Sequence, residues 1–377
     1  MEPNDASLNA LREAINRTLT HDNSVRKQAE AYLQGVEATP GFPRCLLALV
    51  ERHSTSTSGA EDRALRQAAS VMFKNMVKRR WQPAGEYEDL EPITAADREP
   101  IKGALVDLLG RTPPDVQAQL AEAVTIVAAH DFPSKWQWLL PQLSQSLLRE
   151  DMLVTHGVML TANSIMKRFR YVEKSDHLYA DLLHCLESFS APLQTVFTKH
   201  WARVEALTTA GGGRATVDGL LSTLRLIARV FYSLNWQDLP EQFEDNMPAW
   251  MTVFAAVLRY RYLDRTATDD DDDQEAAPLE QLQVAVLENI NLYVEKYEEE
   301  FLPHLPTFTT AVWALLLDVG PQARLDGLAT QGIQFLSTLA GKKTHGALFT
   351  QQVLADIVQV RIYYRLPRIT SFILTYR

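Results

Sequence analysis

The residue pattern that most resembles a chemical site is a run of five aspartates, Asp269–Asp273. A calcium loop needs spaced oxygen ligands, a glycine for its turn and a closing bidentate glutamate, and none of these accompanies the run. Runs of like charge usually stay solvated. We therefore interpret this stretch as a solvated acidic loop, with docking of a basic partner segment as the alternative.

Two further patterns resemble catalytic or phosphate sites but lack a required residue. Gly341–Thr344 reads Gly-Lys-Lys-Thr, yet Leu336 stands where a phosphate loop has its first glycine, so we expect a helix C-cap. His184 and Cys185 are adjacent on an expected helix, where their side chains diverge by about 100° and cannot form a nucleophile–base pair, which favours core packing. H-E-x-x-H, G-x-S-x-G and zinc-type cysteine pairs do not occur. The sequence predicts no catalytic, cofactor-binding or metal-binding residue, and no enzyme.

A basic and polar strip lies on one side of the helix expected to end near Trp81. Its packed side is predicted by apolar residues at helical spacing: Leu65, Ala68, Met72 and Met76. At 100° per residue the opposite side gathers Arg63, Arg66, Gln67, Ser70, Lys74 and Lys78. Asn75 lies beside the apolar stripe, so we expect it to be buried and hydrogen-bonded. The strip is either a solvated face or a surface that recruits an acidic partner.

Turn residues divide the chain into helices that would carry this strip. The apolar residues Leu8, Leu11, Ile15 and Leu19 line the first expected helix. Val25–Ala38 forms the next, and Thr39-Pro40-Gly41 ends it before the helix that contains Cys45. Thr112 as N-cap with Pro113 at the first helical position predicts a later helix start. Another long helix is predicted by apolar residues in register: Val217, Leu221, Leu224, Ile227, Phe231 and Leu234.

The spacing of these helices indicates a repeat architecture. The first helices of successive pairs start near residues 6, 42, 94, 134, 175, 238 and 301. Most steps are close to the ~40 to 47 residues of a HEAT unit, and the longer ones coincide with inserted loops near Gly211 and Asp269. No segment alternates with period two over the length of a strand. We predict an all-α solenoid of about seven helix pairs.

Composition excludes several classes of function. A net charge of -10 and a pI near 5.4 disfavour direct nucleic-acid binding. The two cysteines, Cys45 and Cys185, lie in apolar helical patterns and are expected to be reduced and buried. The first residues do not resemble a signal peptide, and the apolar segment Ala311–Val319 is shorter than the ~20 residues of a membrane span. We expect a soluble intracellular protein without membrane insertion.

Two motifs near the start carry a family resemblance. A-E-x-x-L begins at Ala29, and L-R-x-x-A-x-x-x-x-K-N-x-V-K-x-x-W runs from Leu65 to Trp81. They resemble the importin-β N-terminal domain of nuclear transport receptors. The resemblance implies a right-handed, importin-β-like superhelix of HEAT repeats that binds Ran in its GTP form. It assigns residues 1–100 to the importin-β N-terminal domain and residues 101–357 to further repeats of the same solenoid.

The resemblance also implies residue roles. Second helices of the first repeats would line an inner surface that meets Ran, and the implied contacts are Arg26, Glu30, Arg66, Gln67, Ser70, Lys74 and Lys78. His156–Tyr179, Arg225–Met251 and Tyr293–Phe308 resemble the member of the family that returns importin-α to the cytoplasm. The implied contacts to cargo, or between ends of a closed ring, are Lys167, Arg168, Arg170, Asn235 and Gln237. Ordinary helix-end geometry is the alternative for these five.

These likenesses set the expected biology. The chain would shuttle between nucleus and cytoplasm, crossing the nuclear envelope, with RanGTP and importin-α as partners and nuclear pore proteins left open as a further class. The resemblance fades after about Ile357, and residues 358–377 are interpreted as a divergent basic tail of a truncated or misread chain. A Ran-independent helical-repeat scaffold is the main rival, and an α-helical enzyme is the weakest.

Overall fold

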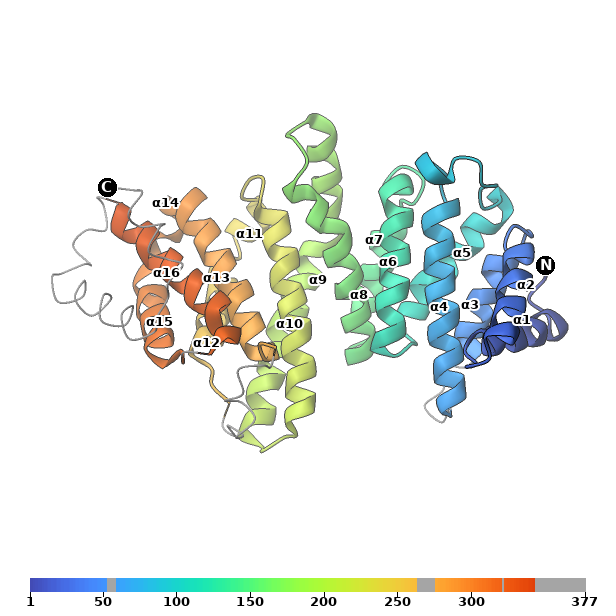
Figure 1. The fold of residues 1–377 in the computed structure, drawn as a ribbon. Helices are drawn as coiled ribbons and strands as arrows, with labels where there is room; N and C mark the ends of the chain where they lie inside the picture. Colours follow the sequence, from blue (N-terminus) through green and yellow to red (C-terminus); the bar gives the residue numbers. More distant parts are fainter. Residues whose placement is uncertain (53–58, 263–274, 321, 343–377) are drawn as a thin grey trace. The chain divides into compact units, whose positions relative to one another are not determined.

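The computed structural model describes residues 1–52, 59–262, 275–320 and 322–342. Throughout these ranges the regular structure is helical (Figure 1), which confirms the predicted all-α class. The acidic run Asp269–Asp273, the end of the Gly341–Thr344 pattern and the basic tail lie outside the described residues. Among the described helices, none combines the length and the apolar composition that crossing a bilayer requires.

The contacts within the chain define two compact units, Met1–Pro192 and Leu193–Arg377. The first unit contains α1 (Asp5–Thr18), α2 (Asn23–Val36), α3 (Phe42–Arg52), α4 (Ala60–Arg80), α5 (Ala95–Leu109), α6 (Pro114–Asp131), α7 (Leu139–Leu147), α8 (Met152–Met166) and the 3-10 turn η2 (Lys167–Arg170). Helix α9 (Asp176–Thr209) starts in the first unit and ends in the second. The second unit continues with α10 (Arg214–Asn235), α11 (Glu241–Glu244), α12 (Met247–Arg259), α13 (Pro278–Lys296), α14 (Glu298–Phe301), α15 (Leu305–Asp318) and α16 (Asp326–Gly341). The expected boundaries near residues 100 and 357 stay predictions.

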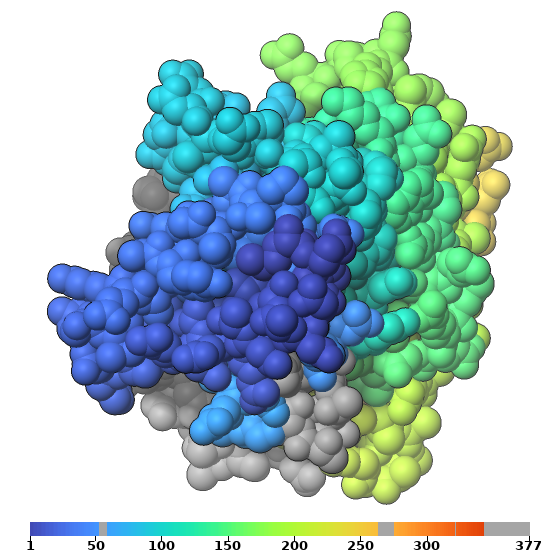
Figure 2. Space-filling view, turned by 90° about the vertical axis from the view of Figure 1, so that its right-hand side faces the viewer, coloured from blue at the N-terminus to red at the C-terminus, as the bar shows by residue number. Residues whose placement is uncertain are grey.

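Each unit is built from two layers of helices. In the first unit α1, α3, α5 and α7 follow one another in one layer, and α4, α6 and α8 lie side by side in the other. In the second unit α12 packs beside α15, and α10, α13 and α16 form the opposite layer. The residues of the first two pairs, dark to light blue, form one contiguous surface in Figure 2. Consecutive long helices make seven pairs over the described residues, as the sequence spacing predicts.

The apolar periodicity explains most of the core. All six residues predicted to be in register on α10 are buried, with Val217 the most exposed at 4%. Leu19 is the exception among the predicted core residues of α1, because the helix ends at Thr18 and Leu19 is 50% exposed. The hydroxyl of Thr18 donates to the carbonyl of Ile15, which closes the last turn. Beyond that turn the helical stripe no longer applies.

Helix starts differ from the predictions where prolines or buried side chains intervene. Pro113 is the N-cap of α6, and the hydroxyl of Thr112 instead donates to the Leu108 carbonyl at 2.9 Å. Residues 134–138, expected to be helical, form turns that bury Trp136 before α7 begins. The helix expected to start near residue 238 is divided into α11 and α12, where Pro248 cannot donate a backbone hydrogen bond.

Buried amides join the layers at equivalent places in both units. Gln117 on α6 donates to the carbonyl of Leu109 at the end of α5, at 2.7 Å, and to the Leu153 carbonyl of α8, at 2.9 Å. Gln283 on α13 donates to the Val257 carbonyl at the end of α12, at 3.1 Å. The bonds to Leu109 and Val257 reach carbonyls in the last turns of α5 and α12, which a helix C-terminus leaves open. A Cβ added at Gly157 would lie 2.6 Å from the Leu109 oxygen, so α8 approaches α5 closely there.

Candidate partner-binding surfaces

Helix α4 buries a wider arc than its sequence pattern indicates. It packs against both α3 and α6, so two sides of the helix are covered. Arg66 and Ser70, predicted on the exposed strip, are 3% and 0% exposed. The hydroxyl of Ser70 donates to the Gln67 carbonyl at 2.8 Å, which satisfies its polar atom within the helix. The prediction of an exposed surface is therefore wrong for these two residues.

A narrower face of α4 remains accessible. Arg63 and Lys78 are exposed, and Gln67 and Lys74 are half-buried. Successive steps of four, seven and four residues place them along one line of the helix, which we call the α4 face. Asn75 lies beside it and is exposed, so the expected burial of Asn75 is wrong. The α4 face carries three cations, which suits an acidic partner.

The implied contacts on α2 are also accessible. Arg26 and Glu30 form an exposed ion pair at 3.8 Å, one helical turn apart. At the other end of α2, Glu37 binds Arg79 at 2.6 Å and Arg80 at 3.4 Å. The arginines in the last turn of α4 thus have an acidic partner within the unit.

The basic cluster after α8 is partly used inside the first unit. Phe169 is 1% exposed and lies in the core, as predicted. Arg168 binds Asp181 of α9 at 3.3 Å and stacks over the rings of Phe169 and Phe132 at 5.2 Å. Lys167 is exposed and Arg170 is half-buried. Arg168 therefore joins η2 to α9. The accessible cations of this cluster are Lys167 and Arg170.

Asn235 is a core residue, so its predicted surface contact is wrong. It is fully buried, its side chain donates to the Phe231 carbonyl at 2.7 Å, and its side-chain oxygen accepts from the Tyr293 hydroxyl at 3.0 Å. The Tyr297 hydroxyl donates to the Asn235 carbonyl at 2.6 Å. Burial, followed by the nearby carboxylates, raises the pKa of Tyr297, so its hydroxyl keeps the proton that it donates. Gln237 just beyond is half-buried.

The cysteines lie in the packed core, and the histidine next to Cys185 borders it. Cys45 and Cys185 are free and buried, as predicted, and burial raises the pKa of Cys185 to about 12, which leaves an unreactive thiol. His184 packs against the Phe132 ring, at 6.0 Å between centroids. Across the described ranges no group of three or more His, Cys, Asp or Glu side chains could hold a metal ion.

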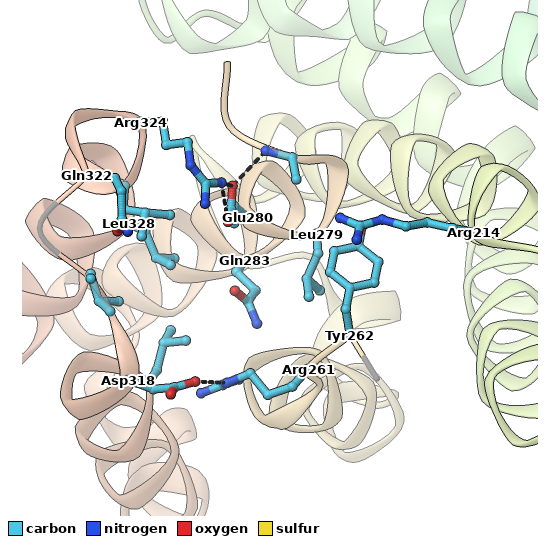
Figure 3. Close-up of a pocket in the computed structure, with 15 residues that line it drawn as sticks. Arg214, Arg261, Tyr262, Leu279, Glu280, Gln283, Asp318, Gln322, Arg324 and Leu328 are labelled. Atoms are coloured by element: carbon cyan, nitrogen blue, oxygen red, sulfur yellow. Dashed lines mark hydrogen bonds and ion pairs between the residues drawn. The ribbon is translucent and has the colours of Figure 1, made fainter. Parts of the chain in front are cut away.

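A cavity of ≈ 120 Å³ in the second unit collects the ends of several helices (Figure 3). Two ion pairs border it: Arg261–Asp318 at 2.6 Å, and Arg324 with both carboxylate oxygens of Glu280 at 2.7 Å. Gln283 points into the space between these pairs. Arg214, the third arginine of the lining, lies 3.8 Å from the carboxylate of Asp218. Each arginine at the cavity therefore has an acidic partner, and we interpret the cavity as a junction between helix ends.

Comparisons with known proteins match this architecture. The Cse1 family model matches residues 165–365, and the importin-beta N-terminal domain model matches residues 29–111, which include α4. The first match extends past Ile357, so the similarity reaches further than the sequence motifs indicate.

Exportin-2 of Oreochromis niloticus and exportin-2 of Homo sapiens are each 38% identical to this chain over 352 residues, 93% of this chain and 35% of each relative. A structure of the exportin Cse1 in its cargo-free, cytoplasmic state has a TM-score of 0.81 at 26% identity, covering 93% of this chain and 36% of that one. This chain spans about a third of the length of these relatives. Because the Cse1 model matches more than half of its residues, the chain belongs to the Cse1 family.

Proposed function

We propose that this chain acts in nuclear transport, binding Ran in its GTP form and taking part in the export of importin-α. Membership of the Cse1 family is the observation that carries the proposal. The relatives named exportin-2 and the likeness to the exportin Cse1 support it. The two-layer helical repeats also suit it, because each pair contacts only its neighbours and small rotations can add along the array.

The proposed mechanism is thermodynamic linkage. If RanGTP and cargo both favour one curvature of the solenoid, each raises the affinity of the other by the same factor. Hydrolysis of GTP by Ran would release both. In this mechanism Ran performs the hydrolysis, and the chain acts through binding alone.

We assign the Ran contact to the α4 face. Lys74, Lys78 and Gln67 are accessible and lie in the matched importin-beta N-terminal domain, as does Glu30 on α2. Arg26, which pairs with Glu30, is exposed and lies three residues before the match. Arg66 and Ser70 are too deeply buried to touch a partner in this conformation. For cargo, or for contact between distant repeats, Lys167, Arg170 and Gln237 are the accessible candidates. Nuclear pore proteins and a shuttling localisation complete the proposal.

Charge reversal on the α4 face tests the Ran contact. We expect Lys74→Glu with Lys78→Glu to weaken RanGTP binding about tenfold or more, with little change in stability, because exposed charges affect association more than folding. Isothermal titration with GTP-loaded and GDP-loaded Ran gives the measurement. Lys199→Glu with Arg203→Glu, two exposed cations one turn apart on α9, is the matched control. Equal affinity for both nucleotide forms would remove Ran from the proposal.

Titration with importin-α tests the part of the proposal that concerns cargo binding. The chain spans about a third of its relatives, and separated patches on a long solenoid reinforce one another through effective concentration. We therefore expect weak, salt-sensitive, GTP-preferring Ran binding and no stable complex with importin-α. A tight ternary complex would mean that these 377 residues contain the whole interface.

A further inference from the structure

Helix α9 has a proline near its midpoint. The helix runs for 34 residues, from Asp176 to Thr209, and Pro192 lies inside it. Proline has no backbone N–H, so the helical hydrogen bond from residue 192 to the Ser188 carbonyl cannot form, and the proline ring also crowds that carbonyl. Sharp bends in helices occur mostly at proline for these reasons. The turn around Pro192 is therefore the part of the α9 backbone that resists bending least.

The same proline coincides with the boundary between the compact units. The first unit ends at Pro192, and the second begins at Leu193. Pro100 also lies inside a helix, α5, but both ends of α5 belong to the first unit. A break in the helical hydrogen bonds thus meets a unit boundary in α9, and it does not do so in α5.

The residues of α9 before the proline are bound to the first unit. Asp181 pairs with Arg168 of η2 at 3.3 Å. His184 packs against the ring of Phe132, the C-cap of α6, at 6.0 Å between centroids. These contacts fasten the first half of α9 to elements that precede it in the chain.

The residues after the proline are bound to the second unit by contacts of their own. The Phe197 ring stacks on Trp250 of α12 at 4.7 Å between centroids. The Trp201 ring lies edge-on to Tyr260, the C-cap of α12, at 5.7 Å between centroids, and the Thr208 hydroxyl lies 2.7 Å from the Tyr260 hydroxyl. A bend at the proline therefore leaves the contacts of both halves intact.

We propose that Pro192 is a hinge at which α9 bends, so that each unit turns as one body about this point. The missing backbone bond makes bending easy at the proline, and the contacts on either side confine it to that turn. Hinge residues are commonly a few positions that absorb the whole change in backbone angle. The inference goes beyond the proposed function and does not rest on it.

Double electron–electron resonance between two nitroxide labels tests the hinge. Glu122→Cys on α6 and Thr252→Cys on α12 place one label at an exposed position of each unit, and the native Cys45 and Cys185 are buried away from the reagent. We expect the distribution of distances between the labels to narrow by about half in Pro192→Ala, because alanine restores the backbone donor and has the highest helix propensity.

Pro100→Ala is the matched control, since it restores a backbone donor inside a helix whose two ends lie in the same unit. Its distance distribution should keep the width found for the unaltered chain. An unchanged width in Pro192→Ala would overturn the hinge. Equal narrowing in Pro100→Ala would overturn it as well, because the effect would then come from general stiffening of helices.

Hydrogen exchange gives a second measurement that needs no label. Peptides covering residues 190–196 should exchange faster than the flanking turns of α9, and about tenfold more slowly in Pro192→Ala than in the unaltered chain, because local opening becomes less favourable. If this turn is already protected as well as its flanks in the unaltered chain, α9 behaves as a stiff rod and the proposal is overturned.

Discussion

The two units bury different kinds of polar and aromatic groups. In the first, Lys102 and Asp131 form an ion pair at 3.0 Å with side chains 2% and 4% exposed, and Asp97 binds Arg44 at 2.8 Å. In the second, the rings of Trp250, Phe243 and Phe254 surround Phe231, at 4.3, 4.7 and 5.6 Å between centroids. Both units use the same two-layer helix pairs.

This difference predicts which substitutions and conditions lower the stability of each unit. Aromatic clusters stabilise by the area they bury and by ring geometry, which pH does not change. A buried ion pair adds little net stability, but loss of one partner leaves a charge without compensation. We therefore expect the stability of the first unit to fall when a buried charge is removed or the pH is lowered. The stability of the second unit should fall when a buried side chain is replaced by a smaller one.

The largest effect is expected at the centre of the aromatic cluster. Phe231→Ala should destabilise the second unit by about 3 to 5 kcal/mol, because it removes a fully buried ring that touches several others. Urea unfolding followed by tryptophan fluorescence measures the loss. Tyr32→Ala, at a ring that is 44% exposed, is the control and should change stability by less than about 0.5 kcal/mol. A loss that small at Phe231 would contradict the packing described.

Removal of the buried cation tests the first unit. Lys102→Ala should cost about 3 kcal/mol or more, since Asp131 loses its ammonium partner and the Lys135 carbonyl loses its donor. The double variant Lys102→Met with Asp131→Leu should recover most of this loss, because no charge remains buried. If the double variant is as unstable as the single one, the packing of the lysine chain matters and its charge does not.

Equivalent amides should respond alike in both units. Gln117→Leu and Gln283→Leu each leave helix-end carbonyls without their donor, which should cost about 1 to 3 kcal/mol. Thermal unfolding of the two variants compares them directly. Both amides donate to two carbonyls, but those of Gln117 belong to the different helices α5 and α8, whereas Val257 and Tyr260 lie at one end of α12. Replacement of Gln117 should therefore be the more costly. The reverse order would mean that the two amides are not equivalent.

The smallest effect is a pH dependence confined to acid. Burial alone raises the pKa of Asp97, but hydrogen bonds from the Gly41 amide and the Thr94 hydroxyl, together with Arg44, outweigh it and hold that pKa below its ordinary value. A lowered folded pKa gives stability that is present above the unfolded pKa of about 4 and is lost as pH falls through the folded value. In Asp97→Asn the midpoint of urea unfolding should depend less on pH between neutral pH and about pH 3. If the urea midpoint of the variant falls with pH as it does in the unaltered chain, another group causes the acid sensitivity.

Helical periodicity determined much of this protein without the structure. The stripe from Val217 to Leu234 and the turn residues predict the pairs, because apolar spacing and capping are local properties. The same local reasoning excluded His184 and Cys185 as a catalytic pair. It also placed Phe169 in the core and left Lys74 and Lys78 accessible.

Tertiary packing decided which polar residues remain accessible. The sequence places Arg66 and Ser70 opposite an apolar stripe, yet α3 and α6 cover two sides of α4 and bury both. The buried side chain of Asn235 accepts a hydrogen bond from the Tyr293 hydroxyl of α13. The side chain of Arg168 forms an ion pair with Asp181 on the following helix. A period of 100° per residue tells which side chains share a side of a helix. The number of sides that neighbours cover depends on helices distant in the chain, and only the folded structure contains that information.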